Sequence, residues 1–420
     1  MQPFETLFAE STRNGLTRPK RVRGNGIKMV NMGEIFAFDR IFKQDMDRVP
    51  VSDKEYDKSI LKEGDLLFAR QSLTLEGAGK CSIVMTDEEM TFESHLIRAR
   101  LQKEIADPMF YYYLFKSKIG KELISSIVEQ VAAAGIRGSD LVKLKVPVPS
   151  VSEQRKISKI LSKIDDQFEL NNAINKNLEV MAQALFKRWF VDFEFLNGNG
   201  EPYKSSGGEF EESELGLIPK GWRVASIGEY ARVKSGFAFK SSWWKTEGIK
   251  VIKIKNIMNN SINLDESDCV DEEKMAKASE FFTNTGDILI AMTGATVGKI
   301  GIVPRNNEKL LVNQRVGKFS LGDQPLKKAG FLFSLLTKKE VFDQIVSVAS
   351  GSAQPNVSPS GIENIKTILP PINILNDFNR VTGSMIQAIV ENSYESKTLE
   401  RIRDTILPKL MSGEIRVPMN

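Results

Sequence analysis

Lysine and arginine side chains gather at two places in the chain where they could neutralise the phosphates of a nucleic acid. Few acidic residues lie beside them, which suits phosphate contacts. An ordinary solvated face is the alternative for either place alone, but basic segments at matching places favour nucleic acid. The first segment contains Arg13, Arg18, Lys20, Arg21, Arg23 and Lys28, and the second contains Lys234, Lys240, Lys245, Lys250, Lys253 and Lys255, interleaved with Phe237, Phe239, Trp243 and Trp244.

Polar side chains that could contact base edges follow a predicted strand pair in each half of the chain. Ser94-His95 pairs with Asn313-Gln314-Arg315 at an offset of 314 − 95 = 219. Asn, Gln and Arg are the side chains that read adenine and guanine edges in the major groove. The candidate DNA-binding residues therefore also include His95, Gln314 and Arg315, together with Arg70 beside the predicted strand 66–69.

The sequence lacks the residue patterns that catalysis or metal binding would need. His95 is the only histidine, which nearly excludes a histidine zinc site, a Ser-His-Asp triad and histidine acid–base chemistry. Gly79-Lys80 and Gly298-Lys299 look like phosphate loops, but Ser or Thr follows neither lysine. Both are better interpreted as glycine turns beside strands. We expect no catalytic residue, no metal ligand and no cofactor bound by this chain.

Composition and charge are those of ordinary globular domains. The chain has 420 residues, 41% of them hydrophobic and 27% charged, with a formal net charge of +4. This length favours two to three domains. No apolar run approaches the ~18 residues of a membrane helix, and the first five residues lack the features of a secretory signal. Cys81 and Cys269 are far apart and have no metal-binding spacing. We therefore expect a cytoplasmic protein without membrane contact.

The same long pattern occurs twice in the chain. Gly26-Ile27-Lys28 recurs as Gly248-Ile249-Lys250 at 248 − 26 = 222, and 64–69 recurs as 286–291 at the same offset. Gly79-Lys80 recurs at 298 − 79 = 219, so the first copy has a loop three residues longer. Two copies of one sequence pattern predict that the two halves of the chain are related by an internal two-fold axis. They also predict a binding partner that has two halves.

Each copy begins with a predicted α+β domain of short strands. Apolar runs bounded by glycine predict strands at 66–69 and 83–85, and 22–38 is interpreted as a strand and a turn. Apolar residues at helical spacing predict a helix over 110–131. The acidic, glycine-containing stretch 209–221 is interpreted as a linker into the second domain.

Each copy ends in a predicted long amphipathic helix that follows two prolines. The first helix covers about 153–190, a length of ~57 Å, and Ser150 and Glu153 have capping-box spacing at its start. Pro408 is expected to end or kink the second helix, and Asp165-Asp166 is interpreted as a solvated face of the first. The apolar stripes are Ile157, Leu161, Ile164, Phe168, Leu178, Ala182, Leu185 and Trp189 in the first helix and Phe378, Met385, Ile389, Leu399, Ile402 and Ile406 in the second.

Polar interruptions at equivalent places predict that the two long helices pair with each other. Asn171 and Asn392 interrupt the stripes at 392 − 171 = 221. Two unrelated surface helices are the alternative, but the shared register and the preceding prolines favour an antiparallel coiled coil. A two-fold axis that relates the two helices would bring the midpoint of one helix against the midpoint of the other. We therefore predict that Asn171 and Asn392 meet near the axis and fix the register.

In this order, the motifs resemble the specificity subunit of type I restriction-modification systems over nearly the whole chain. The first copy lacks the Ile-Pro-Lys-Gly-Trp segment found at 218–222, where the second domain begins. In the second copy, Ile374-Leu375-Asn376 replaces the Glu-Gln found at 153–154. Both departures put strict equivalence of the partner-docking surfaces in doubt. The resemblance is carried by 286–299, 313–315, 351–358 and 369–371 in the second copy, by 147–157 in the first, by the junction segments 185–193 and 215–222, and by the closing stretch 407–415.

The resemblance implies two target recognition domains, each reading one half of a bipartite double-stranded DNA site, and two helices that set the gap between the half-sites. It implies docking with two modification subunits, which bind S-adenosylmethionine and methylate adenine. It also implies restriction subunits that use ATP and Mg to translocate and cut DNA. The chain itself would be non-catalytic.

The expected fold is α+β, with two similar target recognition domains joined by an antiparallel coiled coil of two long helices. We place the first domain at 1–150, the first spacer helix at 151–196, the linker and second domain at 197–371, and the second spacer helix with its tail at 372–420. A self-contained methyltransferase or nuclease and a coiled-coil scaffold without a DNA role remain alternatives. Binding of S-adenosylmethionine to the isolated chain would favour the enzyme, and absence of salt-dependent DNA binding would favour the scaffold.

Overall fold

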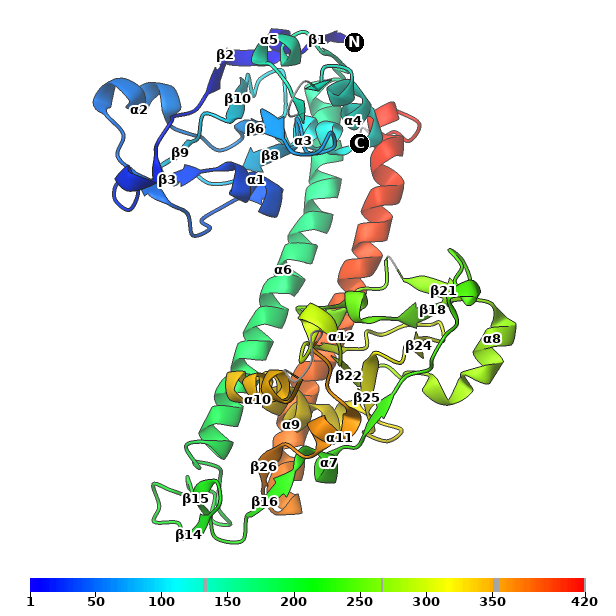
Figure 1. Cartoon of the computed structure of the whole chain (residues 1–420). Helices are drawn as coiled ribbons and strands as arrows, with labels where there is room; N and C mark the ends of the chain where they lie inside the picture. Colours follow the sequence, from blue (N-terminus) through cyan, green and yellow to red (C-terminus); the bar gives the residue numbers. More distant parts are fainter. Residues whose placement is uncertain (131–133, 266, 350–354, 419–420) are drawn as a thin grey trace. The chain divides into compact units, whose positions relative to one another are not determined.

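The computed structural model describes residues 1–130, 134–265, 267–349 and 355–418, and the chain divides into two compact units. Unit 1 contains Met1–Gln167 and Leu399–Asn420, and unit 2 contains Phe168–Thr398. Each unit combines one globular domain with part of both long helices (Figure 1). Val131 of the predicted helix 110–131 and residues 351–354 of the second-copy motif lie outside the described residues.

Unit 1 is built on a five-stranded sheet whose neighbouring strands are antiparallel, except for a parallel pair at one edge. Its central strands are buried along their whole length, which explains their continuous apolar runs. The predicted strands at 66–69 and 83–85 are confirmed, although the second occupies 81–84. In order across the sheet, the strands are β2 (Phe8–Asn14), β10 (Leu96–Leu101), β6 (Leu66–Ala69), β8 (Cys81–Val84) and β4 (Arg40–Ile41).

A second sheet of three strands completes the strand scaffold of unit 1, and its central strand is antiparallel to one neighbour and parallel to the other. Smaller strand pairings and short helices cover the rest. The second sheet is β5 (Arg48–Val49), β3 (Ile27–Val30) and β9 (Met90–Phe92). The other elements are β1 (Gln2–Pro3), β7 (Gln71–Ser72), β11 (Glu129–Gln130), β12 (Ala134–Gly135), β13 (Lys145–Val146), the 3₁₀ turns η1 (Phe4–Leu7) and η2 (Lys20–Val22), and helices α1 (Met32–Ala37), α2 (Asp53–Ser59), α3 (Pro108–Lys116), α4 (Lys118–Ser125) and α5 (Gly138–Leu141).

Two local predictions for unit 1 were wrong in extent. The helix predicted over 110–131 is broken at Ser117, whose hydroxyl accepts a hydrogen bond from the Gly120 amide at 3.2 Å and so caps α4. Both helices keep apolar residues inside, so their spacing alone conceals the break. The stretch 22–38 holds β3 but then a helix rather than a turn, because Asn31 and Glu34 form a capping box at the start of α1.

Unit 2 repeats this architecture on a six-stranded sheet, with a three-stranded sheet beside it. The main sheet has the order β17 (Val233–Ser235), β25 (Val316–Phe319), β22 (Ile288–Ala291), β23 (Ile300–Ile302), β20 (Asn260–Ile262) and β19 (Ile257–Met258). The second sheet is β21 (Asp268–Val270), β18 (Ile249–Ile252) and β24 (Leu311–Val312). The other elements are β14 (Phe210–Ser213), β15 (Gly216–Pro219), β16 (Arg223–Ser226), β26 (Lys366–Leu369), the 3₁₀ turns η3 (Ser241–Trp243), η4 (Ile254–Asn256), η5 (Ser279–Phe281) and η6 (Gly294–Thr296), and helices α7 (Ile227–Tyr230), α8 (Glu272–Lys277), α9 (Leu326–Leu336), α10 (Lys339–Ala349) and α11 (Pro359–Glu363).

Strand pairing confirms the internal repeat. The order β2-β10-β6-β8-β4 in unit 1 corresponds to β17-β25-β22-β23-β20 in unit 2, and in both units the last pair is parallel. The second sheets agree as well, since β3 with β9 and β18 with β24 are both parallel. Gly79 and Gly298 each have a positive φ, +74° and +84°, and return the chain to the neighbouring strand, so both are turns rather than phosphate loops.

The stretch predicted as a linker, 209–221, is instead a β-hairpin. β14 pairs with β15 in antiparallel register, and the Ser213 hydroxyl donates to the Gly216 carbonyl at 2.6 Å in the turn. Aromatic rings support it: Phe195 stacks on Tyr203 at 4.7 Å, and Phe195 lies 4.9 Å from Trp222. The hairpin contacts these rings through Phe210 of β14, which lies 5.9 Å from Tyr203, and its acidic neighbours concealed this contact in the sequence.

The two long helices are α6 (Val151–Phe190) and α12 (Ile372–Ser412). The Ser150 hydroxyl accepts a hydrogen bond from the Glu153 amide at 3.2 Å, which confirms the predicted cap of α6. Pro408 does not end α12, because the helix continues to Ser412. Leu410 and Met411 are buried in the core of unit 1, and their burial offsets the hydrogen bond that the proline removes.

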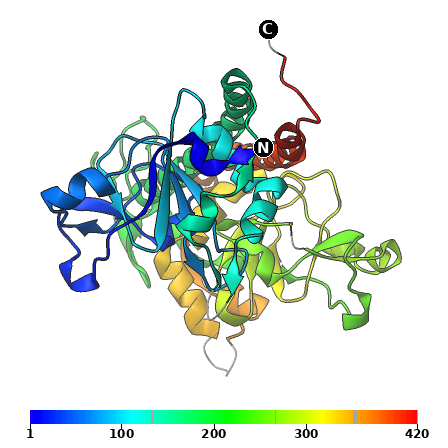
Figure 2. The ribbon, with the colours of Figure 1, turned by 90° about the horizontal axis from the view of Figure 1, so that it is seen from above.

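Within each unit, α6 and α12 pack against each other. In unit 2, Phe186 and Phe190 near the end of α6 contact Phe378 near the start of α12, and Asn171 contacts Ser396. The helices are therefore antiparallel. In unit 1 the first turns of α6 and the last turns of α12 lie side by side, as Figures 1 and 2 show, and share one core. That shared core contains Ile157, Leu161, Leu407, Leu410 and Met411.

Two details of the predicted helix faces were wrong. Ile402, assigned to the apolar stripe, is 45% exposed. Asp165, assigned to a solvated face, is only 5% exposed, because it hydrogen-bonds to Tyr113 and pairs with Arg403. A charge that meets its partners only in three dimensions cannot be distinguished from a solvated one by helical spacing.

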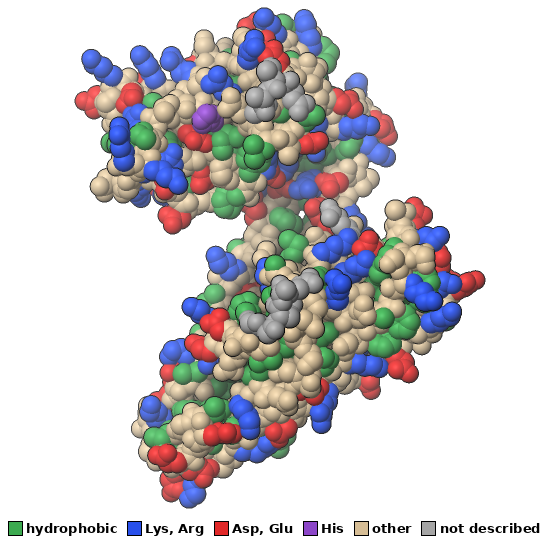
Figure 3. All heavy atoms as spheres, in the orientation of Figure 1, with side chains coloured by type: hydrophobic (Ala, Val, Ile, Leu, Met, Phe, Trp, Pro, Cys, Tyr) green, Lys and Arg blue, Asp and Glu red, His purple; other side chains and the backbone are tan. Residues whose placement is uncertain are grey.

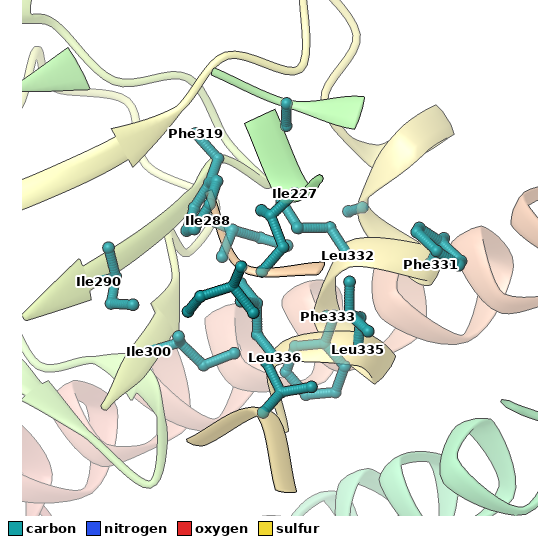
Figure 4. Packing of buried hydrophobic residues seen from close by; sticks show 14 of the residues in the cluster. Ile227, Ile288, Ile290, Ile300, Phe319, Phe331, Leu332, Phe333, Leu335 and Leu336 are labelled. Atoms are coloured by element: carbon teal, nitrogen blue, oxygen red, sulfur yellow. The ribbon is translucent and has the colours of Figure 1, made fainter. Parts of the chain in front are cut away.

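The core of unit 2 joins the sheet, α9 and both long helices. Figure 4 shows side chains of the main sheet, such as Ile288 and Phe319, meeting those of α9, such as Leu332 and Leu336. Phe331 of α9 also lies 5.1 Å from Phe190 of α6. The domain is therefore fixed to the helix pair by an apolar contact.

Phe378→Ala should strongly destabilise unit 2. Phe378 is fully buried, and its ring lies 4.8 Å from Phe190 and 5.6 Å from Trp189. Truncating a buried phenylalanine costs roughly 3–5 kcal/mol. Denaturant unfolding measures the loss. The exposed stripe residue Ile402 serves as the control, since Ile402→Ala should change stability by less than about 0.5 kcal/mol; equal losses would contradict the packing described.

Candidate nucleic-acid interface

Both domains arrange candidate residues around the same backbone hydrogen bonds, at the ends of two central strands of the main sheet. This end of the strands is called the sheet edge below. In unit 1 the Arg70 amide donates to the His95 carbonyl at 2.8 Å, and in unit 2 the Met292 amide donates to the Arg315 carbonyl at 3.0 Å. His95 therefore corresponds to Arg315, at 315 − 95 = 220. The pairing of His95 with Gln314 was wrong by one residue, because a repeated polar motif without its hydrogen bonds does not define the register.

Glycines allow the chain to pass close to this edge. A side-chain carbon on Gly15 would lie 1.9 Å from the Phe92 carbonyl oxygen, and one on Gly236 would lie 2.2 Å from the Val312 oxygen. The residues after these glycines hydrogen-bond to the edge: Ser94 donates to the Leu16 carbonyl at 3.0 Å, and Gln314 donates to the Phe237 carbonyl at 2.9 Å. Both basic segments are thereby held against the edge that carries His95 or Arg315.

Unit 1 leaves part of its basic segment available for an anionic ligand. Arg13 lies on β2, Lys20 and Arg21 lie in η2, and all three are exposed. Arg70 is half-buried and His95 is exposed; the histidine is the purple side chain in Figure 3. Within the described part of the chain, these five side chains form no ion pair with a carboxylate.

The remaining basic residues of the first segment are already neutralised. Arg18 pairs with Glu55 at 2.7 Å and Arg23 with Asp47 at 2.7 Å, while Lys28 pairs with Glu88 at 3.0 Å. The hydrogen bond from Arg18 lowers the pKa of Glu55 to about 2, so this pair stays charged at neutral pH. These three residues serve the local fold, and their carboxylate partners are too distant in sequence to be foreseen.

The second segment is paired to a greater extent. Lys234 lies 3.1 Å from Glu280 and Lys250 lies 3.1 Å from Glu308. Asp268 receives both Lys253 and Lys255, at 2.9 and 3.1 Å, and the hydrogen bond from Lys253 lowers the pKa of Asp268. Lys240, Lys245, Gln314 and Arg315 are exposed and form no ion pair with a described residue.

The aromatic residues of the second segment mainly build a small core. Phe237, Phe239, Trp243 and Trp244 pack around buried Val251. The nitrogen of Lys253 lies 3.3 Å from the Trp244 ring centroid, and Lys240 lies 5.9 Å from that of Trp243. Sequence analysis missed Lys274 and Lys277 of α8, which also lie over Trp243, at 5.6 and 5.8 Å. They follow Glu272-Glu273, so composition alone gave no basic signal.

Charge of both signs covers the face in view in Figure 3, where blue basic side chains alternate with red carboxylates. A general basic surface is therefore not what identifies the interface; the unpaired side chains at the sheet edges are. No group of His, Cys, Asp or Glu in the described ranges is arranged to hold a metal ion. Nor does any helix there have the length and apolar character required to cross a membrane.

The two predicted register residues lie together in unit 2. The Asn171 amide donates to the Asn392 carbonyl at 3.4 Å and to the Ser396 hydroxyl at 3.3 Å. The Asn392 amide in turn donates to Asn175 at 2.9 Å. Asn171 is 2% exposed and Asn392 is half-buried. The asparagines therefore meet through the Asn392 carbonyl and through neighbouring polar side chains.

Comparison with known proteins agrees with this architecture. The family model described as the type I restriction modification DNA specificity domain matches residues 27–180 and 219–402. The chain belongs to this family. The two matched segments correspond to the two copies of the repeat, and the resemblance inferred from the motifs is confirmed.

Relatives of this specificity-domain chain match most of its length. It is 26% identical over 408 residues to the type I restriction enzyme MjaIX specificity subunit of Methanocaldococcus jannaschii, covering 96% of this chain and 89% of that protein. It is 23% identical over 413 residues to the HindI specificity subunit of Haemophilus influenzae, covering 85% and 88%. The solved S subunit of a type I restriction-modification system from M. genitalium has a similar fold, with a TM-score of 0.60 at 16% identity over 100% of this chain and 96% of that one.

Replacing the unpaired residues Lys20 and Arg21 by alanine should lower the salt dependence of DNA binding by this specificity-domain chain. Each lost phosphate contact reduces the slope of log K against log salt by about 1, so the double variant should lose about 2. Binding titrations of the complete complex at several salt concentrations measure the slope. Arg23→Ala, which removes an arginine already paired with Asp47, is the matched control and should leave the slope nearly unchanged; an equal loss in both would contradict the assignment.

Proposed function

We propose that the chain is the sequence-specific DNA-recognition subunit of a type I restriction-modification complex, with each unit reading one half of a bipartite double-stranded site. One observation carries the proposal. Two domains of the same topology, in a chain of this family, present unpaired basic and polar side chains at equivalent sheet edges. Two similar recognition domains in one chain suit a DNA target that has two separated halves.

Some of the available side chains suit contacts with phosphates, and others suit contacts with base edges. Arg13, Lys20 and Arg21 in unit 1 and Lys240 in unit 2 are exposed cations suited to phosphate oxygens. Arg315 and Gln314 have the donor geometry that reads guanine and adenine edges, and Arg70 and His95 occupy the corresponding edge in unit 1. Because the two edges carry different side chains, the half-sites should differ in sequence.

Docking of modification subunits is supported by an apolar face of α6. Leu170, Ile174 and Met181 recur on one side of the helix and are 52%, 37% and 53% exposed. Exposed apolar side chains at this spacing suit a protein partner. In the proposed complex, two modification subunits would supply S-adenosylmethionine and the methylation of adenine. Restriction subunits would supply the chemistry that uses ATP and Mg, and the long helices would set the gap between half-sites.

Mapping of methyladenine on DNA treated with the complete methyltransferase tests the function. The wild-type complex should methylate a motif with two defined halves and an undefined gap. Arg70→Ala/His95→Ala should relax one half, and Gln314→Ala/Arg315→Ala the other, because each lost bidentate contact removes about 1–3 kcal/mol of discrimination. Relaxation of both halves by either variant, or a motif in one piece, would contradict separate reading by the two units.

A further inference from the structure

One buried ion pair connects the two long helices in unit 1. Asp165 of α6 is 5% exposed, and each of its carboxylate oxygens has one partner. Arg403 of α12 donates to one oxygen at 3.0 Å, and the Tyr113 hydroxyl donates to the other at 2.8 Å. Burial opposes the charge of Arg403, but its hydrogen bond to Asp165 raises the pKa of the guanidinium above its ordinary value. The same guanidinium also lies 3.0 Å from Asp404, whose side chain is 59% exposed, so Arg403 holds a buried carboxylate on one side and a solvated one on the other.

The equivalent place in unit 2 is apolar. The helices repeat at an offset of 221, so Asp165 corresponds to Ile386 of α12 and Arg403 corresponds to Ala182 of α6. Ile386 and Ala182 are both fully buried. The helix pair is thus symmetric in its backbone pattern but carries a buried opposite-charge contact at one end only.

The polar contacts in the middle of the helix pair are partly the same for both helices. Asn171 of α6 contacts Ser396 of α12, and Asn392 of α12 contacts Asn175 of α6. At the repeat offset of 221, residue 171 of α6 corresponds to residue 392 of α12, and residue 396 of α12 corresponds to residue 175 of α6. The two contacts are therefore equivalent. The Asn171 amide also donates to Glu395 at 2.8 Å, where α6 has Ile174, but Glu395 is exposed and water competes for this contact. Two copies of α6 would still give Asn171 a polar partner, Asn175, in place of Ser396. Stronger selection between like and unlike helices must therefore come from outside the centre.

We propose that the Asp165–Arg403 ion pair is a self-recognition key that allows α6 to pair with α12 and excludes pairing of α6, or of α12, with the same helix of a second copy of the chain. An α6–α6 pair would bury Asp165 against Ala182 of the other copy. An α12–α12 pair would bury Arg403 against Ile386. The first arrangement leaves the buried carboxylate of Asp165 without a cation, and the second leaves Arg403 with only the exposed carboxylate of Asp404. Both are unfavourable and act as selection against the wrong pairing.

The order of synthesis gives this selection a role. The first domain and α6 are complete before α12 has been made, and domains fold as they emerge from the ribosome. During this interval the apolar stripe of α6 has no partner in its own chain, whereas neighbouring chains present an identical stripe. On the proposed function, a like-with-like pair would also carry two identical recognition domains and would read the wrong target.

Refolding of the full chain followed by cleavage tests the key. Two forms of the chain with different N-terminal tags are unfolded together and refolded at roughly millimolar concentration, where pairing between chains competes with pairing inside one chain. A protease site placed in the exposed loop at Gly198–Gly200 is then cut. Each tagged N-terminal fragment is recovered with the fragment that its helix has paired with.

Wild-type chains should yield N-terminal fragments bound to C-terminal fragments only. Asp165→Leu/Arg403→Leu should raise the share of N-terminal pairs carrying both tags by about tenfold or more, because the buried charges no longer oppose them. Lys163→Leu/Arg401→Leu, at exposed positions of the same helices in unit 1, is the matched control and should behave as wild type. Asp165→Asn/Arg403→Gln removes both charges with little change in volume and carries the same expectation if the leucine variant does not refold.

Two results would overturn the proposal. One is a share of like-with-like pairs in the uncharged variants that is as low as in wild type. The other is a wild-type chain that forms such pairs as readily as the variants do. Neither depends on DNA binding, so the proposed DNA-recognition function stands or falls separately.

Discussion

The apolar stripes of α6 and α12 can meet only in the register in which their buried polar side chains find partners. Asn171 is 2% exposed, and its amide reaches the Ser396 hydroxyl and the Asn392 carbonyl, while Asn392 reaches Asn175 at 2.9 Å. A slip of one turn would leave a buried amide without partners, at a cost of about 1–3 kcal/mol. This polar layer therefore fixes the register of the two helices in unit 2.

The two copies of one topology have diverged in chemistry. Unit 2 holds the helices through aromatic rings, with Phe190 close to both Phe331 and Phe378. Unit 1 holds them through the hydrogen-bonded pair Asp165–Arg403. The sheet edges diverge in the same way, since equivalent backbone positions carry His95 in one unit and Arg315 in the other. The fold therefore fixes where each reading edge lies, while the side chains decide what it recognises.

The elements that depend on local pattern could be predicted from the sequence. The duplication, the cap at Ser150, both long helices and the meeting of Asn171 with Asn392 follow from spacing and repeat offset. The features that depend on distant partners could not. Glu55, Asp47 and Glu88 neutralise three of the basic candidates, and Tyr113 and Arg403 bury Asp165, yet no periodicity connects these residues. The hairpin β14–β15 was missed for the same reason, because the rings that contact its Phe210, those of Phe193 and Tyr203, lie outside it in the sequence.

The central claim is that one chain contacts two separate tracts of DNA, one through each unit. Hydroxyl-radical footprinting of the complete complex on its methylated site tests this most directly, with Lys20→Ala/Arg21→Ala and Lys240→Ala chains compared with wild type. The account predicts two protected tracts separated by an unprotected gap, with each variant weakening protection of a different tract. A single continuous tract, or equal weakening of both tracts by either variant, would contradict it.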